Sequence, residues 1–208
     1  MPGPRVITLG CRLNTLESEI IRSQADNAEL DDTIIVNTCA VTAQAERQAR
    51  QTIRRLRRDN PEVQIIVTGC AAQLKREEFA SMKEVDRVIG NSEKMIGGHL
   101  SGHSDTNIDV SDIMDVTSAI DVPVISGFEN RTRAFVQVQQ GCDHRCTFCI
   151  IPFARGPNRS VSPEHIIKQV QTLTENGHVE VVLTGVDVSS FGQDDEKLPT
   201  LGMLARTI

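Results

Sequence analysis

Three apolar segments of the chain share one pattern, in which a short β-branched run ends in a cysteine. The segments are residues 6–11, 34–39 and 65–70, and they end in cysteines 11, 39 and 70. Nearly continuous apolar runs of this length are typical of strands buried in a parallel sheet. Because parallel strands lie about 5 Å apart and end at one edge, the pattern predicts that the three thiols converge there.

Helical patterns between these segments complete a strand–helix alternation. Residues 15–25 and 43–59 predict two helices, and residues 85–89 predict a fourth short strand. The apolar stripe of the second helix comprises Ala45, Ala49, Ile53 and Leu56. This alternation predicts an α/β domain over residues 1–98, with a three-layer architecture around a parallel sheet and right-handed crossovers.

Residues 99–130 interrupt the alternation and are rich in Gly, Ser and Asp. Positions 101–130 hold five aspartates and one glutamate but no Lys or Arg. We interpret this segment as an acidic linker with one or two short ordered pieces.

A second strand–helix–strand unit is predicted within residues 131–208. Its strands are expected over 134–139 and 179–183. Ser162 offers an N-cap for the intervening helix, and the next residue is a proline, which suits the first helical turn.

A second group of cysteines follows the first strand of that unit. Cys142, Cys146 and Cys149 have the spacing Cys-x3-Cys-x2-Cys. Three thiolates this close can hold three irons of a [4Fe–4S] cube and leave the fourth iron open for a substrate. A structural zinc site would need a fourth ligand. His144 could supply it only by straining the loop. An electron-transfer cluster and a zinc knuckle are the alternatives.

The first three cysteines, Cys11, Cys39 and Cys70, also predict a three-cysteine cluster with an open iron. For any one of them, the alternative is a buried cysteine that packs as a small hydrophobe. The chain has no run of about 18 apolar residues and no signal peptide at its N-terminus, so we expect a cytoplasmic protein without a membrane span. Thiols stay reduced there, which favours metal ligands over disulfides.

The charge of the chain is unevenly distributed. The net charge is −6, so the chain as a whole is not a basic nucleic-acid binder. Residues 43–60 nevertheless hold six arginines against one glutamate and one aspartate. A solvated helix face is the favoured interpretation of this run, and contact with RNA phosphates is the alternative.

The segment from Gly141 to Cys149 resembles the cluster motif of the radical S-adenosylmethionine (SAM) superfamily. The resemblance implies that the open iron binds SAM and that cleavage of SAM yields a 5′-deoxyadenosyl radical. It also implies that Phe148 packs near the adenine of SAM. Gly185 and Asp187, which follow the next strand, are implied to contact SAM, although a simple turn is the alternative for these two residues.

With both cysteine groups, nearly the whole chain resembles the methylthiotransferases. The matching motifs are residues 9–14, 37–42, 69–73, 141–149 and 150–156. The resemblance is to the branch that acts on N6-threonylcarbamoyladenosine at tRNA position 37. It implies two [4Fe–4S] clusters, SAM, an electron donor and a tRNA anticodon loop as substrate, with no catalytic residue identified beyond the cluster cysteines. The branch usually has Arg-Ser-Arg-Ser after Arg-Gly, so one basic residue is lost where Pro157 stands here.

Two other functions remain open at this stage. One is methylthiolation of an aspartate in a ribosomal protein, and the other is a non-catalytic iron–sulfur module. A radical-SAM barrel contains about six strand–helix repeats, of which residues 131–208 supply only the beginning. We therefore expect an incomplete chain whose partner includes the remainder of the barrel, and doubtful activity for this chain alone.

Overall fold

The computed structural model describes residues 3–102, 106–119, 122–128 and 131–208. The chain forms two compact units, Met1–Ile113 and Met114–Ile208. The boundary between them falls inside the segment interpreted as a linker. Positions 103–105, 120–121 and 129–130 of that segment lie outside the described residues. The predicted domain limits stay predictions.

A five-stranded parallel sheet forms the centre of the first unit, which confirms the predicted α/β fold. The strands lie in the order β1-β2-β3-β4-β5, and every neighbouring pair is parallel. Their bounds are Arg5–Thr8, Thr33–Thr38, Gln64–Gly69, Arg87–Ile89 and Ile108–Asp109. The two-residue strand β5 lies within the predicted linker and extends the sheet beside β4.

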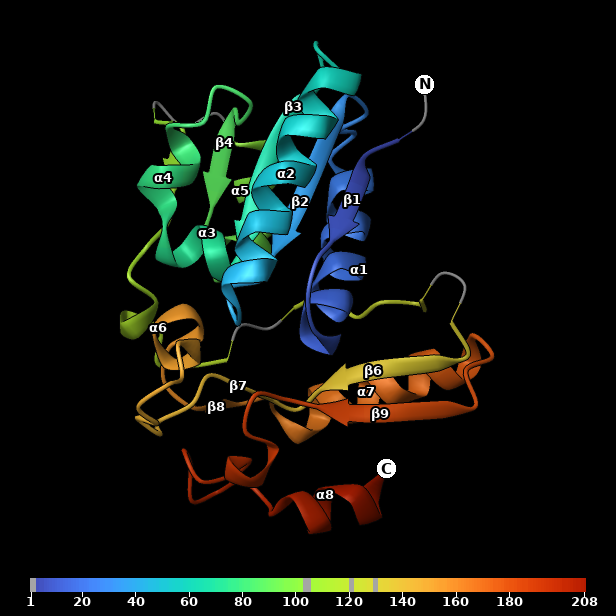
Figure 1. Cartoon of the computed structure of the whole chain (residues 1–208). Coiled ribbons are helices and arrows are strands. Elements are labelled where there is room, and N and C mark those ends of the chain that lie inside the picture. Colours follow the sequence, from blue (N-terminus) through green and yellow to red (C-terminus); the bar gives the residue numbers. More distant parts are fainter. Residues whose placement is uncertain (1–2, 103–105, 120–121, 129–130) are drawn as a thin grey trace. The chain divides into compact units, whose positions relative to one another are not determined.

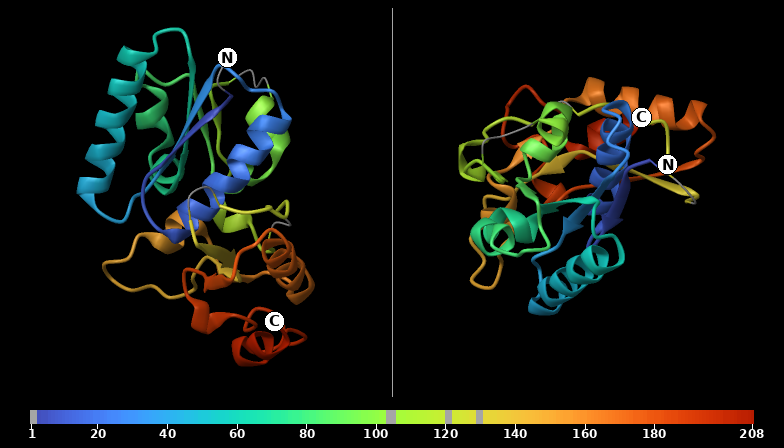
Figure 2. Two further views of the ribbon diagram at one scale, coloured as in Figure 1. Left: turned by 90° about the vertical axis from the view of Figure 1, so that its right-hand side faces the viewer. Right: turned by 90° about the horizontal axis from the view of Figure 1, so that it is seen from above.

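Helices cover both faces of this sheet, as the three-layer prediction requires. Figure 2 shows α2 on one side of the strands and α1 and α5 on the other. The helices are α1 Arg12–Asn27, α2 Ala43–Asp59, α3 Cys70–Leu74, α4 Arg76–Ala80 and α5 Gly97–Ser101, with 3-10 turns η1 Glu93–Met95 and η2 Ile113–Asp115. Helix α2 starts where Thr42 caps it by accepting a hydrogen bond from Ala45 N.

Helix α1 starts three residues earlier than the sequence pattern predicted. Cys11 is its N-cap residue, and the Cys11 carbonyl accepts a hydrogen bond from Thr15 N at 3.0 Å. The first turn therefore contains polar residues that interrupt the apolar pattern. This early start places the first cysteine at the junction of β1 and α1.

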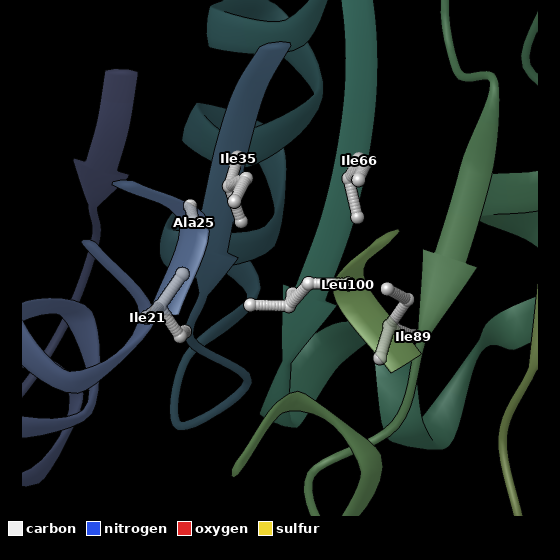
Figure 3. Packing of buried hydrophobic residues seen from close by; sticks show 6 residues of the cluster. All are labelled: Ile21, Ala25, Ile35, Ile66, Ile89 and Leu100. Atoms are coloured by element: carbon white, nitrogen blue, oxygen red, sulfur yellow. The ribbon is translucent and has the colours of Figure 1, made fainter. Parts of the chain in front are cut away.

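The core between the sheet and the α1 face is aliphatic. Ile35, Ile66 and Ile89 project from three neighbouring strands toward Ile21 of α1 and Leu100 of α5, as Figure 3 shows. All five side chains are at most 1% exposed. Full burial of each isoleucine contributes about 2 kcal/mol relative to exposure, which fixes the strand register and so the positions of the strand ends.

The second unit begins with the predicted strand–helix–strand arrangement. Strand β6 Arg133–Gln137 pairs in parallel with β9 Glu180–Thr184, and helix α7 Pro163–Glu175 connects them in sequence. Ser162 caps α7 by accepting a hydrogen bond from His165 N. Figure 1 shows α7 lying along the β6–β9 pair. The other elements are β7 Gln139–Gln140, α6 Ile151–Arg155, β8 Arg159–Ser160, η3 Val188–Ser190 and α8 Leu201–Thr207.

The single strand predicted over 134–139 is divided at Val138. Val138 N donates to Thr184 O of β9, whereas Val138 O accepts from Val161 N. The chain thus changes partners at this residue, and β7 continues as an antiparallel pair with β8. The segment that leads into the cysteine loop therefore pairs with β8 and not with β9. Among the described residues, no helix is long and apolar enough to cross a membrane.

Two candidate metal centres

The strand register brings the first three cysteines to one edge of the sheet. Thr38 is paired with Gly69, so Cys39 and Cys70 follow directly after partnered residues of β2 and β3. Leu9 N donates to Asn37 O at 2.9 Å, which extends the β1–β2 pairing toward Cys11. Figure 1 shows that β1, β2 and β3 end on the same side of the first unit. Cys11 is exposed, whereas the other two thiols are buried.

Two glycines allow these strand ends to approach one another. A Cβ on Gly10 would lie 2.7 Å from Cys39 Cβ and 3.1 Å from Cys39 Sγ. A Cβ on Gly69 would lie 2.3 Å from Thr38 O, and its φ of +95° favours glycine. The backbone beside the thiols is therefore closed to larger residues, which suits a compact three-thiol site.

Asn14 joins the loops that carry the first two cysteines. Its Nδ2 donates to Leu9 O at 2.8 Å and to Thr38 O at 2.9 Å, the carbonyls that lie two residues before Cys11 and one before Cys39. Its Oδ1 lies 3.5 Å from Cys11 Sγ. Asn14 is 1% exposed. The sequence analysis included this residue in a motif but did not assign it this role.

A buried polar network lies behind the cysteines. The ammonium of Lys94 lies 2.7 Å from Glu17 Oε2 and 2.7 Å from Asn91 Oδ1. Asn91 Nδ2 in turn lies 3.8 Å from Cys70 Sγ. Lys94 and Glu17 are fully buried. Sequence reasoning missed Lys94 and Glu17, because a single charged residue on a helix or turn carries no signal of burial.

The second three cysteines lie in one loop of the second unit. Cys142 and Cys149 are partly buried and Cys146 is exposed. The loop closes where Cys142 N donates to Gly156 O at 3.0 Å and Cys149 N donates to Cys146 O at 3.0 Å. A Cβ on Gly141 would lie 1.7 Å from Pro157 O, and its φ is +75°. This glycine therefore permits the closed path of the loop.

Burial and neighbouring acidic groups affect the pKa of the first thiol of this loop, Cys142. Burial raises the pKa of the Cys142 thiol, and the nearby Asp187, Cys149 and Cys146 raise it further. A hydrogen bond from the His144 backbone opposes this effect. A bound metal would reverse the balance, because a coordinating thiol is deprotonated.

Asp187 lies beside this loop at the end of β9. Hydrogen bonds from the Ser189 and Ser190 hydroxyls, at 2.6 and 2.7 Å, lower the pKa of its carboxyl. His144 lowers it further, with Nε2 at 3.2 Å from Oδ2. Asp187 Oδ2 also lies 4.0 Å from Cys142 Sγ. The carboxylate is thus held next to the cysteine loop.

Gln139 connects the strand ends that flank the loop. Its Nε2 donates to Gly141 O and Asn158 Oδ1, each at 2.7 Å. Its Oε1 accepts from Val186 N at 2.9 Å and Asp187 N at 2.8 Å. The side chain is fully buried. Sequence analysis placed Gln139 in a strand and did not identify this bridging role.

The other two residues expected to bind SAM, Phe148 and Gly185, differ in exposure and in packing. Phe148 is 92% exposed at the tip of the loop. A Cβ on Gly185 would lie 2.8 Å from Gln139 Oε1, so the glycine also has a packing role. Their contacts with SAM stay predictions. Arg159, two residues after the position where the branch has a further basic residue, is only 2% exposed and donates to Arg155 O, so it faces the interior of its unit.

The donor chemistry of both groups suits iron–sulfur clusters. All six cysteines are free thiols, and thiolates are the usual ligands of such clusters. Within the described residues, no three His, Cys, Asp or Glu side chains lie close enough together to hold a single metal ion. A [4Fe–4S] cube holds its thiolates farther apart than a single ion does. The first three cysteines lie at one edge of the sheet, and the second three lie in one loop. Ligation stays a prediction.

The arginines of α2 divide into two sets. Arg57 pairs with Asp86 and donates to the carbonyls of Pro61 and Val63, and Arg50 pairs with Glu78. These two therefore have structural partners. Other arginines of the helix are exposed, among them Arg54 and Arg55. Contact with RNA phosphates is therefore considered for these exposed arginines.

Comparison with known proteins agrees with this division into two regions. The model of "Uncharacterized protein family UPF0004" matches residues 5–90, which contain the first three cysteines. The model of the "Radical SAM superfamily" matches residues 136–205, which contain the second three.

Relatives resemble the chain over both regions. A Rickettsia prowazekii protein named threonylcarbamoyladenosine tRNA methylthiotransferase MtaB is 48% identical over 203 residues, which cover 98% of this chain and 48% of the relative. The Bacillus subtilis protein of the same name is 39% identical, covering 90% and 44%. An Amoebophilus asiaticus tRNA-2-methylthio-N(6)-dimethylallyladenosine synthase is 34% identical, covering 94% and 44%. The chain spans about half the length of these curated relatives.

Proposed function

This chain belongs to the radical-SAM methylthiotransferase family, and on that premise we propose that it serves in methylthiolation of N6-threonylcarbamoyladenosine at tRNA position 37. The observation that carries the proposal is the 48% identity, over 203 residues, to a relative named for that activity. The match includes both regions that bear cysteine triplets. The substrate is the anticodon loop of tRNA, and an electron donor is required.

Two clusters are part of the proposal. Cys142, Cys146 and Cys149 hold one [4Fe–4S] cluster, and the triplet at the sheet edge of the first unit holds the other. The second unit supports the first assignment through its closed loop, which carries all three thiols. The strand register and the glycines that flank the thiols support the second assignment.

A SAM-binding cluster, when present, supplies the one-electron chemistry that an unactivated aromatic C–H bond requires. The chain's own residues shape the site around it. Gln139 ties the ends of β7 and β9 together, so Asp187 stays next to Cys142. We assign Asp187 and Gly185 to SAM contact because they stand at the carboxyl end of a strand, where parallel α/β folds bind ligands. Phe148 offers an exposed ring for the adenine.

The first test is anaerobic reconstitution of the chain with iron and sulfide. Two cubes correspond to about eight irons per chain. Formation of 5′-deoxyadenosine under dithionite would support a working SAM site, and binding of iron without SAM cleavage would instead favour a non-catalytic iron–sulfur module.

The second test concerns the substrate. The reconstituted chain is incubated with SAM and tRNA that carries either N6-threonylcarbamoyladenosine or N6-dimethylallyladenosine, and the nucleosides are analysed by mass spectrometry. We expect a methylthio product only from the first tRNA. Modification of the second tRNA alone would overturn the substrate assignment. A ribosomal protein serves as a third substrate, and its modification would favour the aspartate branch.

A further inference from the structure

A fully buried ion pair lies behind the first three cysteines, and cluster ligation alone does not account for it. Lys94 and Glu17 are 0% exposed, with Nζ and Oε2 separated by 2.7 Å. A buried ion pair is weak evidence for stability, because removal of two charges from water offsets much of their attraction. The partners of Lys94 on the side of the cysteines give it a second role.

Lys94 determines the orientation of the Asn91 amide. Its Nζ lies 2.7 Å from Asn91 Oδ1. An ammonium group only donates hydrogen bonds, so it must face the amide oxygen and leave the NH2 group pointing elsewhere. That Nδ2 lies 3.8 Å from Cys70 Sγ, within reach of an N–H···S hydrogen bond. The Asn91 backbone is held as well, since its N donates to Gln73 Oε1 at 2.8 Å.

The same ammonium reaches the strand that precedes the second cysteine. Lys94 Nζ lies 3.4 Å from Asn37 Oδ1, and Asn37 Nδ2 donates to Asn14 O at 3.1 Å. Asn37 and Asn91 are at most 2% exposed. The network thus joins the ends of β2 and β4 to α1 in an interior from which water is excluded. A donor to a sulfur acts more strongly in such an environment than at the surface.

We propose that Asn91, oriented by Lys94, donates a hydrogen bond to the Cys70 sulfur and thereby raises the reduction potential of the cluster at the sheet edge. The inference rests on the proposed function, because it takes that cluster as bound. Reduction adds negative charge to a cluster and its sulfurs, and hydrogen bonds to sulfur stabilise that state. Asn91 is therefore a positioning residue for the cluster.

The test uses the full chain in which Cys142, Cys146 and Cys149 are all replaced by Ala, so that only the first site can be loaded. The potential is measured by anaerobic redox titration followed by electron paramagnetic resonance. Asn91→Leu removes the donor, and we expect about a tenfold less favourable reduction, which is about 59 mV for one electron.

Asn91→Asp is the second variant, since it keeps an oxygen toward Lys94, has the same shape and replaces the donor by an acceptor. It should lower the potential at least as much. Gln24→Leu is the matched control. It removes another buried amide of the first unit, one that donates to Met95 O, and should leave the potential unchanged.

The outcomes separate the inference from its premise. Normal iron content with an unchanged potential in Asn91→Asp would overturn the role of Asn91 and leave the cluster assignment intact. If Asn91→Leu does not fold, the isosteric variant decides. Failure of the parent protein to load iron would overturn the proposed cluster itself, and the inference with it.

Discussion

The two cysteine triplets are built in opposite ways. Cys11, Cys39 and Cys70 come from three strand ends and meet through the register of a sheet whose core is fully buried. The second triplet lies within one loop of eight residues, 142–149, and its middle member is exposed. The first site therefore depends on the fold of its whole unit, and the second depends on local backbone geometry.

The two sites also differ in the side chains that support them. Buried side chains of several elements stand behind the first triplet, and they include a lysine and a glutamate. Polar groups at two strand ends, with Gln139 between them, support the second loop. A site that is fixed by a buried network tolerates little change in that network. A loop on the surface leaves room for a cofactor and a substrate.

Substitution of a cysteine in one site or the other is expected to have the largest effect, because it should remove one cluster and leave the other. Cys146→Ala should abolish SAM cleavage, because it removes a proposed ligand of the SAM-binding cluster, while about four irons per chain remain at the first site. Cys39→Ala should leave SAM cleavage intact and lose the other iron complement. Iron analysis and 5′-deoxyadenosine formation measure both. Loss of all iron from either variant would contradict two independent sites.

Removal of the buried lysine tests how far the first site depends on its network. Lys94→Met leaves Glu17 buried without its cation and should destabilise the first unit by about 3–5 kcal/mol. Hydrogen exchange resolved by peptide measures this effect, and peptides of the second unit should keep their protection. The double variant Lys94→Met/Glu17→Leu should recover most of the loss. Equal loss of protection in both units would contradict the comparison.

Two glycine substitutions compare a crowded position beside the second site with an open position elsewhere in the same unit. Gly141→Ala should cost about 3 kcal/mol, because the added Cβ would meet Pro157 O at 1.7 Å. Gly177 has a similar positive φ of +88° but no heavy atom within 4 Å of an added Cβ, so Gly177→Ala should cost only about 1 kcal/mol. Denaturant unfolding measures the difference. Equal costs would show that φ alone matters.

The smallest effect is expected on the surface of the first unit. Arg54→Glu/Arg55→Glu changes exposed residues and should alter stability by less than about 0.5 kcal/mol. Arg57→Ala should cost more, because Arg57 donates to three backbone carbonyls and pairs with Asp86. A lower tRNA affinity of the double variant, with a smaller salt dependence, would indicate phosphate contact. An unchanged affinity at matched salt would identify a solvated face.

Much of the fold followed from local patterns. The apolar runs and the stripe of α2 predicted the parallel sheet, and the cap at Ser162 predicted the start of α7. Short elements such as α3, α4 and β5 were not predicted individually, because few residues carry little periodic signal. The division of the predicted strand at Val138 was also not predicted, because it depends on hydrogen-bond partners that are distant in the sequence.

The sequence by itself predicted the cluster chemistry of this protein, because cysteine spacing and strand-end position are local properties that specify which thiols can gather. Only the tertiary structure decided which side chains lie behind those thiols. Asn14, Glu17 and Lys94 look like ordinary polar residues until packing buries them and sets their partners. Burial is a property of the assembled core. It brings these polar side chains into a hydrogen-bonded network that reaches the sulfur of Cys70.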